Sequence, residues 1–205
     1  HLNGLLHPTT GTVTVNGVDI SASTEEAKKM RHKVGMVFQY PEHQLFEETI
    51  AQDIAFGPKN LGLSADDVDE RVRDAMKFVG LDYDTYAERS PFHLSGGQMR
   101  RVAIAGVVAM DPDFLVLDEP SAGLDPFGRE EIFEEIIRLH KEKGITVILV
   151  SHNMEDISRM ASRLVVLDKG RIVLDGEPMD IFNNHRDELQ AVGVDVPPVS
   201  VTMEY

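Results

Sequence analysis

Two short apolar runs separated by a helical pattern constrain the fold of this chain more than any other feature. The runs FLVL (114–117) and TVILV (146–150) are continuous and apolar, as expected of strands that are buried on both faces. Between them, residues 127–143 carry apolar side chains at helical spacing, and Gly144 ends this pattern. The predicted inner stripe of this helix is Ile132, Phe133, Ile136, Ile137 and His140. Strand–helix–strand alternation of this kind predicts an α/β fold with a mostly parallel sheet.

The segments before this region predict a hairpin, a strand and a helical lobe. Residues 11–20 alternate apolar and polar side chains around Asn16-Gly17, which indicates a β-hairpin. Residues 34–38 form a further predicted strand. From 41 to 90 the pattern is helical, with Ser64 and Asp67 resembling a capping box and Gly80 at a helix end.

Composition excludes several classes of protein. The net charge of −15 provides no basic surface for a nucleic-acid backbone, so no nucleic acid is expected as a partner. Cysteine is absent, which excludes disulfides and thiolate chemistry and fits a reducing compartment. The longest apolar run, 102–110, is too short to span a bilayer, so a membrane role has to come through a partner.

Polar side chains follow three of the predicted strands. Gln39 follows the strand at 34–38, Asp118-Glu119 follows FLVL, and Ser151-His152 follows TVILV. Ligands of open α/β sheets bind beyond the carboxyl ends of the strands, so these side chains are candidates for one site. A carboxylate there can hold a hydrated Mg²⁺ and its neighbour can orient a water for phosphoryl transfer.

Simpler interpretations of these residues remain. An isolated Asp-Glu pair is more often a turn or a helix cap, and His152 alone fits an ordinary histidine at a strand end. None of the eight histidines has a metal-binding spacing to another, which argues against a zinc site.

LSGGQ (94–98) stands directly before an almost wholly apolar helical run. A helix N-terminus has unpaired N–H groups and a partial positive charge, and glycines let an anion such as phosphate approach that backbone. Ser95 adds a hydroxyl group. The alternative is a Ser-Gly-Gly turn that only caps a core helix.

Together the motifs resemble those of the ATP-binding subunits of ABC transporters. In chain order they are VFQYP (the Q-loop), LSGGQ (the signature), FLVLDEP (Walker B and the catalytic glutamate), SAGLD (the D-loop) and VSHNM (the switch histidine). Residues 42–63 are most similar to energy-coupling factor (ECF) ATPases, which drive uptake of vitamins and of transition metals such as cobalt. The resemblance implies a P-loop NTPase core of the ABC type with an additional helical subdomain.

The resemblance implies a role for each motif residue in a head-to-tail dimer that binds ATP and Mg²⁺. The signature residues are expected to contact ATP held by the other subunit; they are Ser95, Gly96, Gly97 and Gln98. Asp118 is expected to support Mg²⁺, which Gln39 senses, and Glu119 is expected to polarise the attacking water. His152 is expected to hold the γ-phosphate. Asp125 belongs to the D-loop and is also placed to cap the helix that Pro126 begins.

The resemblance also implies a domain division and partners. The expected parts are 1–40, a partial core up to the Q-loop; 41–93, the helical subdomain; 94–176, the RecA-like core; and 177–205, the start of a C-terminal extension. Within this last part, Pro197-Pro198 is expected to open an extension that the chain cuts short. The dimer partner is an identical or a related ATPase subunit. The other expected partners are a transmembrane coupling subunit and a separate substrate-binding membrane protein, which places the chain peripherally at the cytoplasmic face of the membrane.

One element of the family pattern is absent from the sequence. The string G-x-x-x-x-G-K-[S/T], or Walker A, does not occur in these 205 residues. The chain is therefore expected to begin inside the helix that follows this motif, to lack the N-terminal strands and to be inactive alone. We also expect an exposed apolar sheet edge and marginal stability.

Two other functions are compatible with these motifs. The first is an ABC-type ATPase head from repair, chromosome or translation machinery. Gln39 and Leu94 lie only 55 positions apart with no heptad run between them, which argues against the chromosome type. The second is a partner subunit without Walker A that lends its signature motif in trans.

Overall fold

A computed structural model describes residues 1–196, which form two compact units. The first unit comprises His1–Ile148, and the second begins at Leu149. The Pro197-Pro198 pair, predicted to open a C-terminal extension, lies outside the described residues. The four-part division of the chain stays a prediction.

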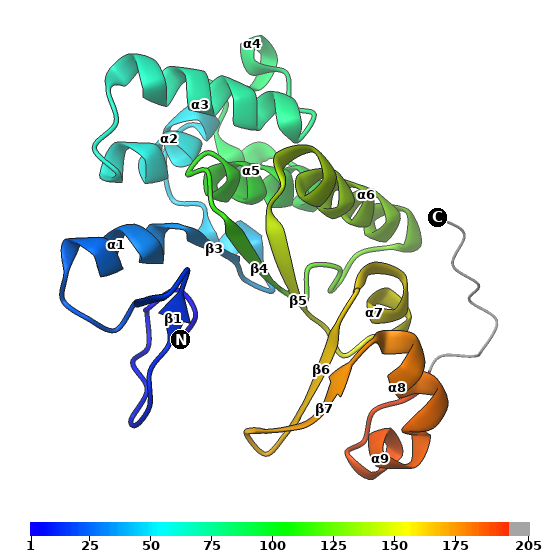
Figure 1. The fold of residues 1–205 in the computed structure, drawn as a ribbon. Helices are drawn as coiled ribbons and strands as arrows, with labels where there is room; N and C mark the ends of the chain where they lie inside the picture. The colour runs from blue at the N-terminus through cyan, green and yellow to red at the C-terminus, as the bar shows by residue number, and fades with distance from the viewer. Residues whose placement is uncertain (197–205) are drawn as a thin grey trace. The chain divides into compact units, whose positions relative to one another are not determined.

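The first unit is built on a three-stranded sheet of order β3-β4-β5 (Figure 1). Its strands are β3 (Val34–Val37), β4 (Phe114–Asp118) and β5 (Thr146–Val150), and the boundary between the units falls within β5, after Ile148. β3 and β4 are parallel, and their register pairs Val34 with Phe114 and Val37 with Leu117. The predicted α/β fold with a parallel sheet is therefore confirmed.

The helices of the first unit agree with the predicted pattern. They are α1 (Glu25–His32), the 3₁₀ turn η1 (Pro41–Gln44), α2 (Ile50–Asn60), α3 (Ala65–Phe78), α4 (Tyr83–Tyr86), the 3₁₀ turn η2 (Pro91–His93), α5 (Gly96–Val108) and α6 (Pro126–Lys143). The predicted start and end of α3 are confirmed, since Ser64 Oγ accepts the Asp67 N–H at 3.2 Å and Gly80 has a positive φ of 71°. Among these helices, α2, α3 and α4 make up the helical lobe, and α2 and α3 both pack against α5.

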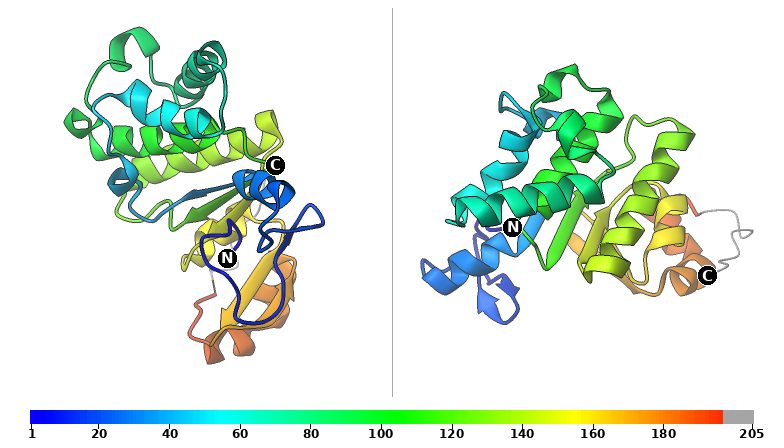
Figure 2. Two further views of the ribbon diagram at one scale, coloured as in Figure 1. Left: turned by 90° about the vertical axis from the view of Figure 1, so that its left-hand side faces the viewer. Right: turned by 90° about the horizontal axis from the view of Figure 1, so that it is seen from above.

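Close packing joins the helices to the sheet. Figure 2 shows α5 and α6 on one face of the sheet, and α5 packs directly on β3. A Cβ atom at Gly35 of β3 would lie 2.4 Å from a methyl carbon of Val107 in α5, so only glycine permits this approach. The C-terminal end of α5 thus packs closely on β3, while α2, α3 and η1 also contact this helix.

The inner face of α6 differs in part from the predicted stripe. Ile132, Phe133 and Ile136 are buried as expected, whereas His140 is exposed. Its ring Nδ1 lies 2.9 Å from the Ile145 carbonyl oxygen. At the end of the stripe, Leu139 is buried in place of the predicted His140. Glu135, which the prediction did not include, is also buried.

The end strand β5 is less buried than predicted. Its residues range from half-buried to exposed, and Val150 is 48% exposed. The expectation that 146–150 is buried on both faces is wrong, because β5 is the last strand in the order of this sheet and has a pairing partner on one side only. The exposed apolar edge that was expected from missing N-terminal strands stays a prediction.

The N-terminal hairpin forms as predicted, but the helix expected before it does not. β1 (Thr14–Val15) and β2 (Val18–Asp19) pair antiparallel, with Asn16 and Gly17 both at positive φ, as a type I′ turn requires. Residues 1–13 contain a single turn, in which the Gly4 N–H donates to the His1 carbonyl oxygen at 3.0 Å. One hydrogen-bonded turn is too short to propagate a helix, and Gly4 has a left-handed φ of 77°.

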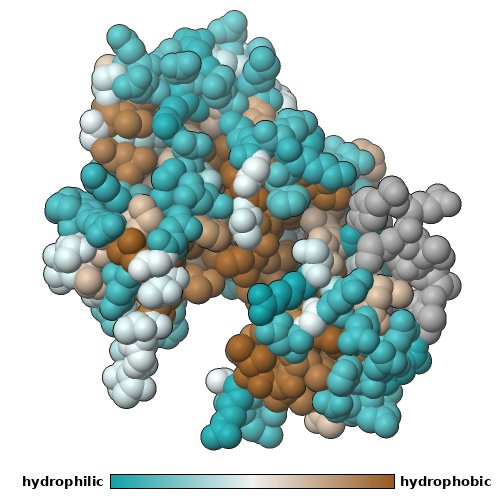
Figure 3. Space-filling model, viewed as in Figure 1, coloured by the Kyte–Doolittle hydropathy of each residue, from teal (hydrophilic) through white to brown (hydrophobic). Residues whose placement is uncertain are grey.

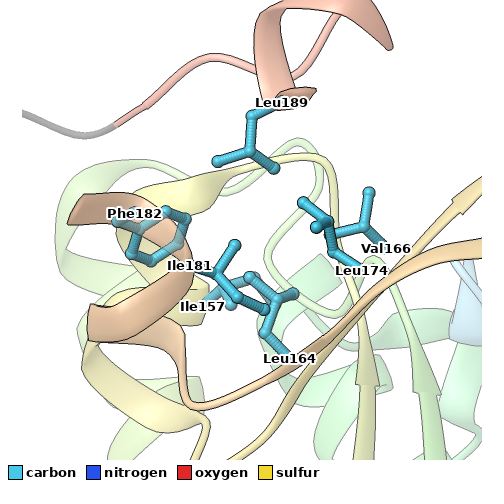
Figure 4. Close-up of a cluster of buried hydrophobic side chains, with 7 residues drawn as sticks. All are labelled: Ile157, Leu164, Val166, Leu174, Ile181, Phe182 and Leu189. Carbon is cyan, nitrogen blue, oxygen red and sulfur yellow. The ribbon is translucent and has the colours of Figure 1, made fainter. Parts of the chain in front are cut away.

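The second unit packs three helices against an antiparallel hairpin. Its elements are α7 (Met154–Met160), β6 (Leu164–Asp168), β7 (Arg171–Gly176), α8 (Pro178–Asn184) and α9 (Arg186–Ala191). Its core, drawn in Figure 4, consists of Ile157, Leu164, Val166, Leu174, Ile181, Phe182 and Leu189. The hairpin also carries exposed apolar side chains, visible as hydrophobic surface in Figure 3.

Candidate functional site

The sheet of the first unit brings three of the predicted site residues to one edge. Asp118 is the last residue of β4, Glu119 follows it, and Gln39 lies two residues beyond β3. Because β3 and β4 are parallel and in register up to the pair Val37 and Leu117, their carboxyl ends lie side by side. All three side chains are half-buried. Two carboxylates and one amide therefore lie at the carboxyl ends of the strands, where α/β proteins bind ligands. We call this end of the sheet, with Gln39, Asp118 and Glu119, the sheet edge.

These donors fit a Mg²⁺ ion. Oxygen atoms of one carboxylate and one amide are the hard ligands that Mg²⁺ accepts, and it retains waters or takes phosphate oxygens for the rest. Across the described residues 1–196, no group of three or more His, Cys, Asp and Glu side chains forms a metal centre. A Mg²⁺ ion held by Asp118 and Gln39 would take its remaining ligands from water or phosphate oxygens.

Glu119 is held in an unusual backbone conformation. Its φ of 48° lies in the left-handed region, which a non-glycine residue adopts at a cost of about 1 kcal/mol or more. The Glu119 carbonyl oxygen accepts the Ala122 N–H at 3.0 Å, which closes a turn directly after β4. The backbone thus reverses sharply at the residue predicted to be catalytic.

The loop after Glu119 ends in a helix cap. Asp125 Oδ1 accepts the Gly128 N–H at 2.7 Å, and Pro126 begins α6. The capping role predicted for Asp125 is confirmed. Its D-loop role stays a prediction.

The signature motif forms the first turn of α5. Ser95 is its N-cap and Gln98 completes a capping box, as the alternative interpretation of a capped core helix requires. Ser95, Gly96 and Gly97 are exposed, and no atom lies within 4 Å of a Cβ built on either glycine. The backbone of this turn is therefore open to a ligand from outside the helix.

The free N–H groups at this turn are those of the glycines. The Gln98 N–H donates to Ser95 Oγ at 3.3 Å, so the cap satisfies the third position of the helix. In the described part of the chain, the N–H groups of Gly96 and Gly97 have no hydrogen-bond acceptor. A helix of 13 residues with two unpaired donors at its start favours an anion.

Sequence reasoning missed Arg100, which lies one turn into α5. Arg100 is 6% exposed and donates hydrogen bonds from its guanidinium to the carbonyl oxygens of Pro120 and Ala122. The sequence indicates this burial only through an arginine that stands directly before an apolar helical run. That signal does not reveal which carbonyl groups accept the hydrogen bonds.

His152 belongs to the second unit. It is exposed between β5 and α7, and the neighbouring Asn153 caps α7 by accepting the Glu155 N–H at 3.0 Å. Because His152 and the sheet edge belong to different units, the placement of His152 at the nucleotide stays a prediction.

The chain matches known proteins along most of its length. The family described as "ABC transporter" matches residues 1–122. The energy-coupling factor transporter ATP-binding protein EcfA2 of Clostridium tetani is 56% identical over 203 residues, which cover 99% of this chain and 70% of that protein. The EcfA2 protein of a Bacillus cereus strain is 57% identical over 199 residues, which cover 96% of this chain and 67% of that protein.

Solved structures have the same fold. The structure of cbiO1 from Clostridium perfringens, part of the ABC transporter complex cbiONQ, superposes with a TM-score of 0.79 at 36% identity, covering 96% of this chain and 77% of that one. The ATP-binding cassette MJ0796, solved as a dimer bound to ADP and Pi, superposes with a TM-score of 0.71 at 27% identity, covering 86% of this chain and 77% of that one. The predicted resemblance to ABC transporter ATPases, and among them to ECF ATPases, is confirmed. This chain belongs to the ABC transporter family and is related within it to the ATP-binding proteins of energy-coupling factor transporters.

Proposed function

We propose that this chain is the ATP-binding and ATP-hydrolysing subunit of an uptake transporter of the energy-coupling factor type. The observation that carries the proposal is the sheet edge that collects Gln39, Asp118 and Glu119, in the same unit as the open first turn of α5. The names of the relatives support the transporter role. Vitamins or transition-metal ions are the proposed cargo, chosen by a separate membrane protein.

The proposed roles at the sheet edge follow from the chemistry of the side chains. Glu119 orients the attacking water, since a carboxylate can accept its proton. Asp118 and Gln39 hold Mg²⁺, which when bound neutralises negative charge on the phosphates. His152 holds the γ-phosphate by hydrogen bonding.

The signature turn is proposed to act on ATP bound to another subunit. The unpaired N–H groups of Gly96 and Gly97 donate to the γ-phosphate, and the Ser95 hydroxyl and Gln98 complete the contact. The dimeric ATP-binding cassette among the structural relatives supports a pair of subunits. Head-to-tail pairing, with an identical or a related subunit, would place this turn opposite the partner's sheet edge.

The helical lobe offers a surface for a transmembrane partner at residues 42–60. Phe46 and Phe56 are 57% and 44% exposed, and their rings meet edge to face with centroids 4.8 Å apart. Asp53 Oδ2 accepts the N–H groups of Phe46 and Glu47, at 3.2 and 3.0 Å, and so fixes the loop that presents Phe46. No helix in residues 1–196 has the length and apolarity to cross a bilayer. We propose that the chain docks through this surface at the cytoplasmic face of the membrane.

The experiment that tests the enzymatic role is Glu119→Gln in the native transporter complex. ATP binding is expected to persist, while turnover falls by about 100-fold or more because the carboxylate that orients water is lost. Glu131→Gln is the matched control, because it makes the same change at a carboxylate on α6 whose partner is Arg101 in a half-exposed ion pair. Turnover of Glu119→Gln at the rate of this control would contradict the role of Glu119.

The partner surface is tested by crosslinking. Crosslinkers placed at residues 42–60 are expected to capture the transmembrane subunit, and those placed on α6 to capture it much less. Equal capture from both positions in an assembled complex would contradict docking through the helical lobe.

A further inference from the structure

The buried guanidinium of Arg100 connects α5 to the loop that follows Glu119. Arg100 is 6% exposed, and a charge so buried requires hydrogen-bond acceptors. Nη1 donates to the Pro120 carbonyl oxygen, and Nη2 donates to the Ala122 carbonyl oxygen at 3.2 Å. The two acceptors flank Ser121, so one side chain contacts the loop at two points.

The loop from 119 to 125 has little regular structure of its own. It consists of turns, in which the Ala122 N–H donates to the Glu119 carbonyl oxygen at 3.0 Å and the Leu124 N–H to the Ser121 carbonyl oxygen at 3.2 Å. Glu119 and Gly123 both have positive φ, at 48° and 73°. Because neither a helix nor a sheet ladder defines this stretch, side-chain contacts have to fix its conformation.

We propose that Arg100 is a positioning residue that holds this loop in the conformation that presents Glu119 to the nucleotide. The proposal rests on the function proposed above, in which Glu119 orients the attacking water. Arg100 touches neither substrate nor Mg²⁺ in this scheme. It acts through the carbonyl groups of Pro120 and Ala122, the first of which is adjacent to Glu119 in the chain.

The geometry favours arginine over other side chains. A guanidinium is a planar fork that can donate to two carbonyl oxygens at once, whereas the lysine ammonium is a single point of charge. Methionine would fill a similar volume but would leave both carbonyl groups without this donor. The conformation of the loop should therefore depend on the fork and not only on the charge.

The contact also has a consequence for communication between two sites. The first turn of α5 is proposed to contact the ATP of another subunit, while Glu119 acts on the ATP of its own. Arg100 lies five residues after the Ser95 cap and is fixed to the loop that carries Glu119. A displacement of α5 on engaging the partner's nucleotide would thus be transmitted to the catalytic loop of the same chain.

Hydrogen exchange of the 205-residue chain tests the positioning directly. Arg100→Met is expected to speed exchange in the loop 119–125 by about tenfold, while α3 exchanges as before. Arg101→Met is the matched control, since it removes the neighbouring arginine, with its half-exposed ion pair of 3.1 Å to Glu131 and its charge near Glu135, but leaves the contacts of Arg100 with the loop in place. Unchanged exchange in the loop, or an equal increase in both variants, would overturn the proposal.

Kinetics in the native transporter complex test its catalytic consequence. Arg100→Lys keeps the charge and the fold, and it is expected to lower kcat about tenfold with the KM for ATP within about threefold. If Arg100→Lys matched the unsubstituted chain in both the hydrogen exchange of the loop and kcat, the role of the planar guanidinium would be overturned. A raised KM with an unchanged kcat would overturn it as well. A failure of the proposed function can be told apart from a failure of this proposal. If Glu119 does not orient the attacking water, Glu119→Gln keeps its turnover, while hydrogen exchange still shows whether Arg100 holds the loop.

Discussion

Ser95 and Gln98 exchange hydrogen bonds across the first turn of α5. The Ser95 N–H donates to Gln98 Oε1 at 3.1 Å, and the Gln98 N–H donates to Ser95 Oγ at 3.3 Å. The capping box pairs the N–H groups of Ser95 and Gln98, which lie on either side of Gly96 and Gly97. The N–H groups of the two glycines stay available. The same residues can therefore stabilise the helix and present an anion-binding turn.

Removing the cap should affect stability and turnover together. Ser95→Ala is expected to lower the free energy of unfolding by about 1 kcal/mol, because the Gln98 N–H loses its acceptor. In the transporter complex it should also lower ATP turnover. Ser64→Ala removes the equivalent cap of α3, where Ser64 Oγ accepts the Asp67 N–H at 3.2 Å. This control should lose similar stability in chemical denaturation and keep its turnover, so equal turnover in the two variants would contradict a functional role of the signature turn.

Substitution of Gly97 should separate stability from activity. Gly97 does not have a positive φ and no atom would lie within 4 Å of an added Cβ, so alanine fits the free chain. Gly97→Ala is expected to stabilise α5 by a few tenths of a kcal/mol to about 1 kcal/mol. Turnover in the complex should nevertheless fall, because the Cβ obstructs phosphate at the backbone. A raised melting temperature with undiminished turnover would show that no ligand approaches this glycine.

The buried carboxyl of Glu135 should make stability depend on pH. Burial raises its pKa from 4.5 to about 7, although the charges of Arg101 on α5 and Arg138 on α6 oppose the shift; the nearby Glu131 adds to it. The folded chain thus holds a proton that the unfolded chain releases from about pH 4.5 upward. Stability is therefore expected to fall as the pH rises from about 4.5 to 7, by roughly 3 kcal/mol at most, and to level off above that.

Glu135→Gln should remove this pH dependence. The variant is expected to unfold at a higher temperature than the unsubstituted chain at pH 8 and at nearly the same temperature at pH 4.5. Glu134→Gln, at the exposed neighbouring position, serves as the control and should change neither value much. If the melting temperature of Glu135→Gln changed with pH between 4.5 and 8 as that of the unsubstituted chain does, Glu135 would not be the source of the pH dependence.

Phe46 should contribute to docking on the membrane partner. Phe46→Ser removes an exposed ring that packs on Phe56, and it is expected to weaken assembly with the transmembrane subunit about tenfold, because an apolar contact is lost. Phe92→Ser is the control, since Phe92 is also 57% exposed but lies in η2, outside residues 42–60. Co-purification with the membrane subunit measures both. Equal loss of assembly in both variants would point to a general effect of exposed phenylalanine.

Local signals in the sequence predicted the elements that depend on few residues. Asn16-Gly17 specified the hairpin because both positions need positive φ, and Asp125-Pro126 specified the start of α6 because the carboxylate caps the helix. The five motifs were recognisable by residue type and spacing, and they led to the family without any tertiary information. Periodicity was less reliable for α6, where it placed His140 inside and overlooked Leu139.

The sequence by itself determined the strand ends at which the polar residues occur, the turn of glycines before α5 and the family of the chain. Only the tertiary structure decided that β3 and β4 are neighbours in register, which brings Gln39 beside Asp118 and Glu119. It alone showed that the fork of Arg100 reaches the carbonyl groups of Pro120 and Ala122, twenty residues and more along the chain. The physical reason is that turns and caps are satisfied by neighbours in sequence, whereas strand register and the partner of a buried charge depend on which distant backbone groups the packing brings within reach.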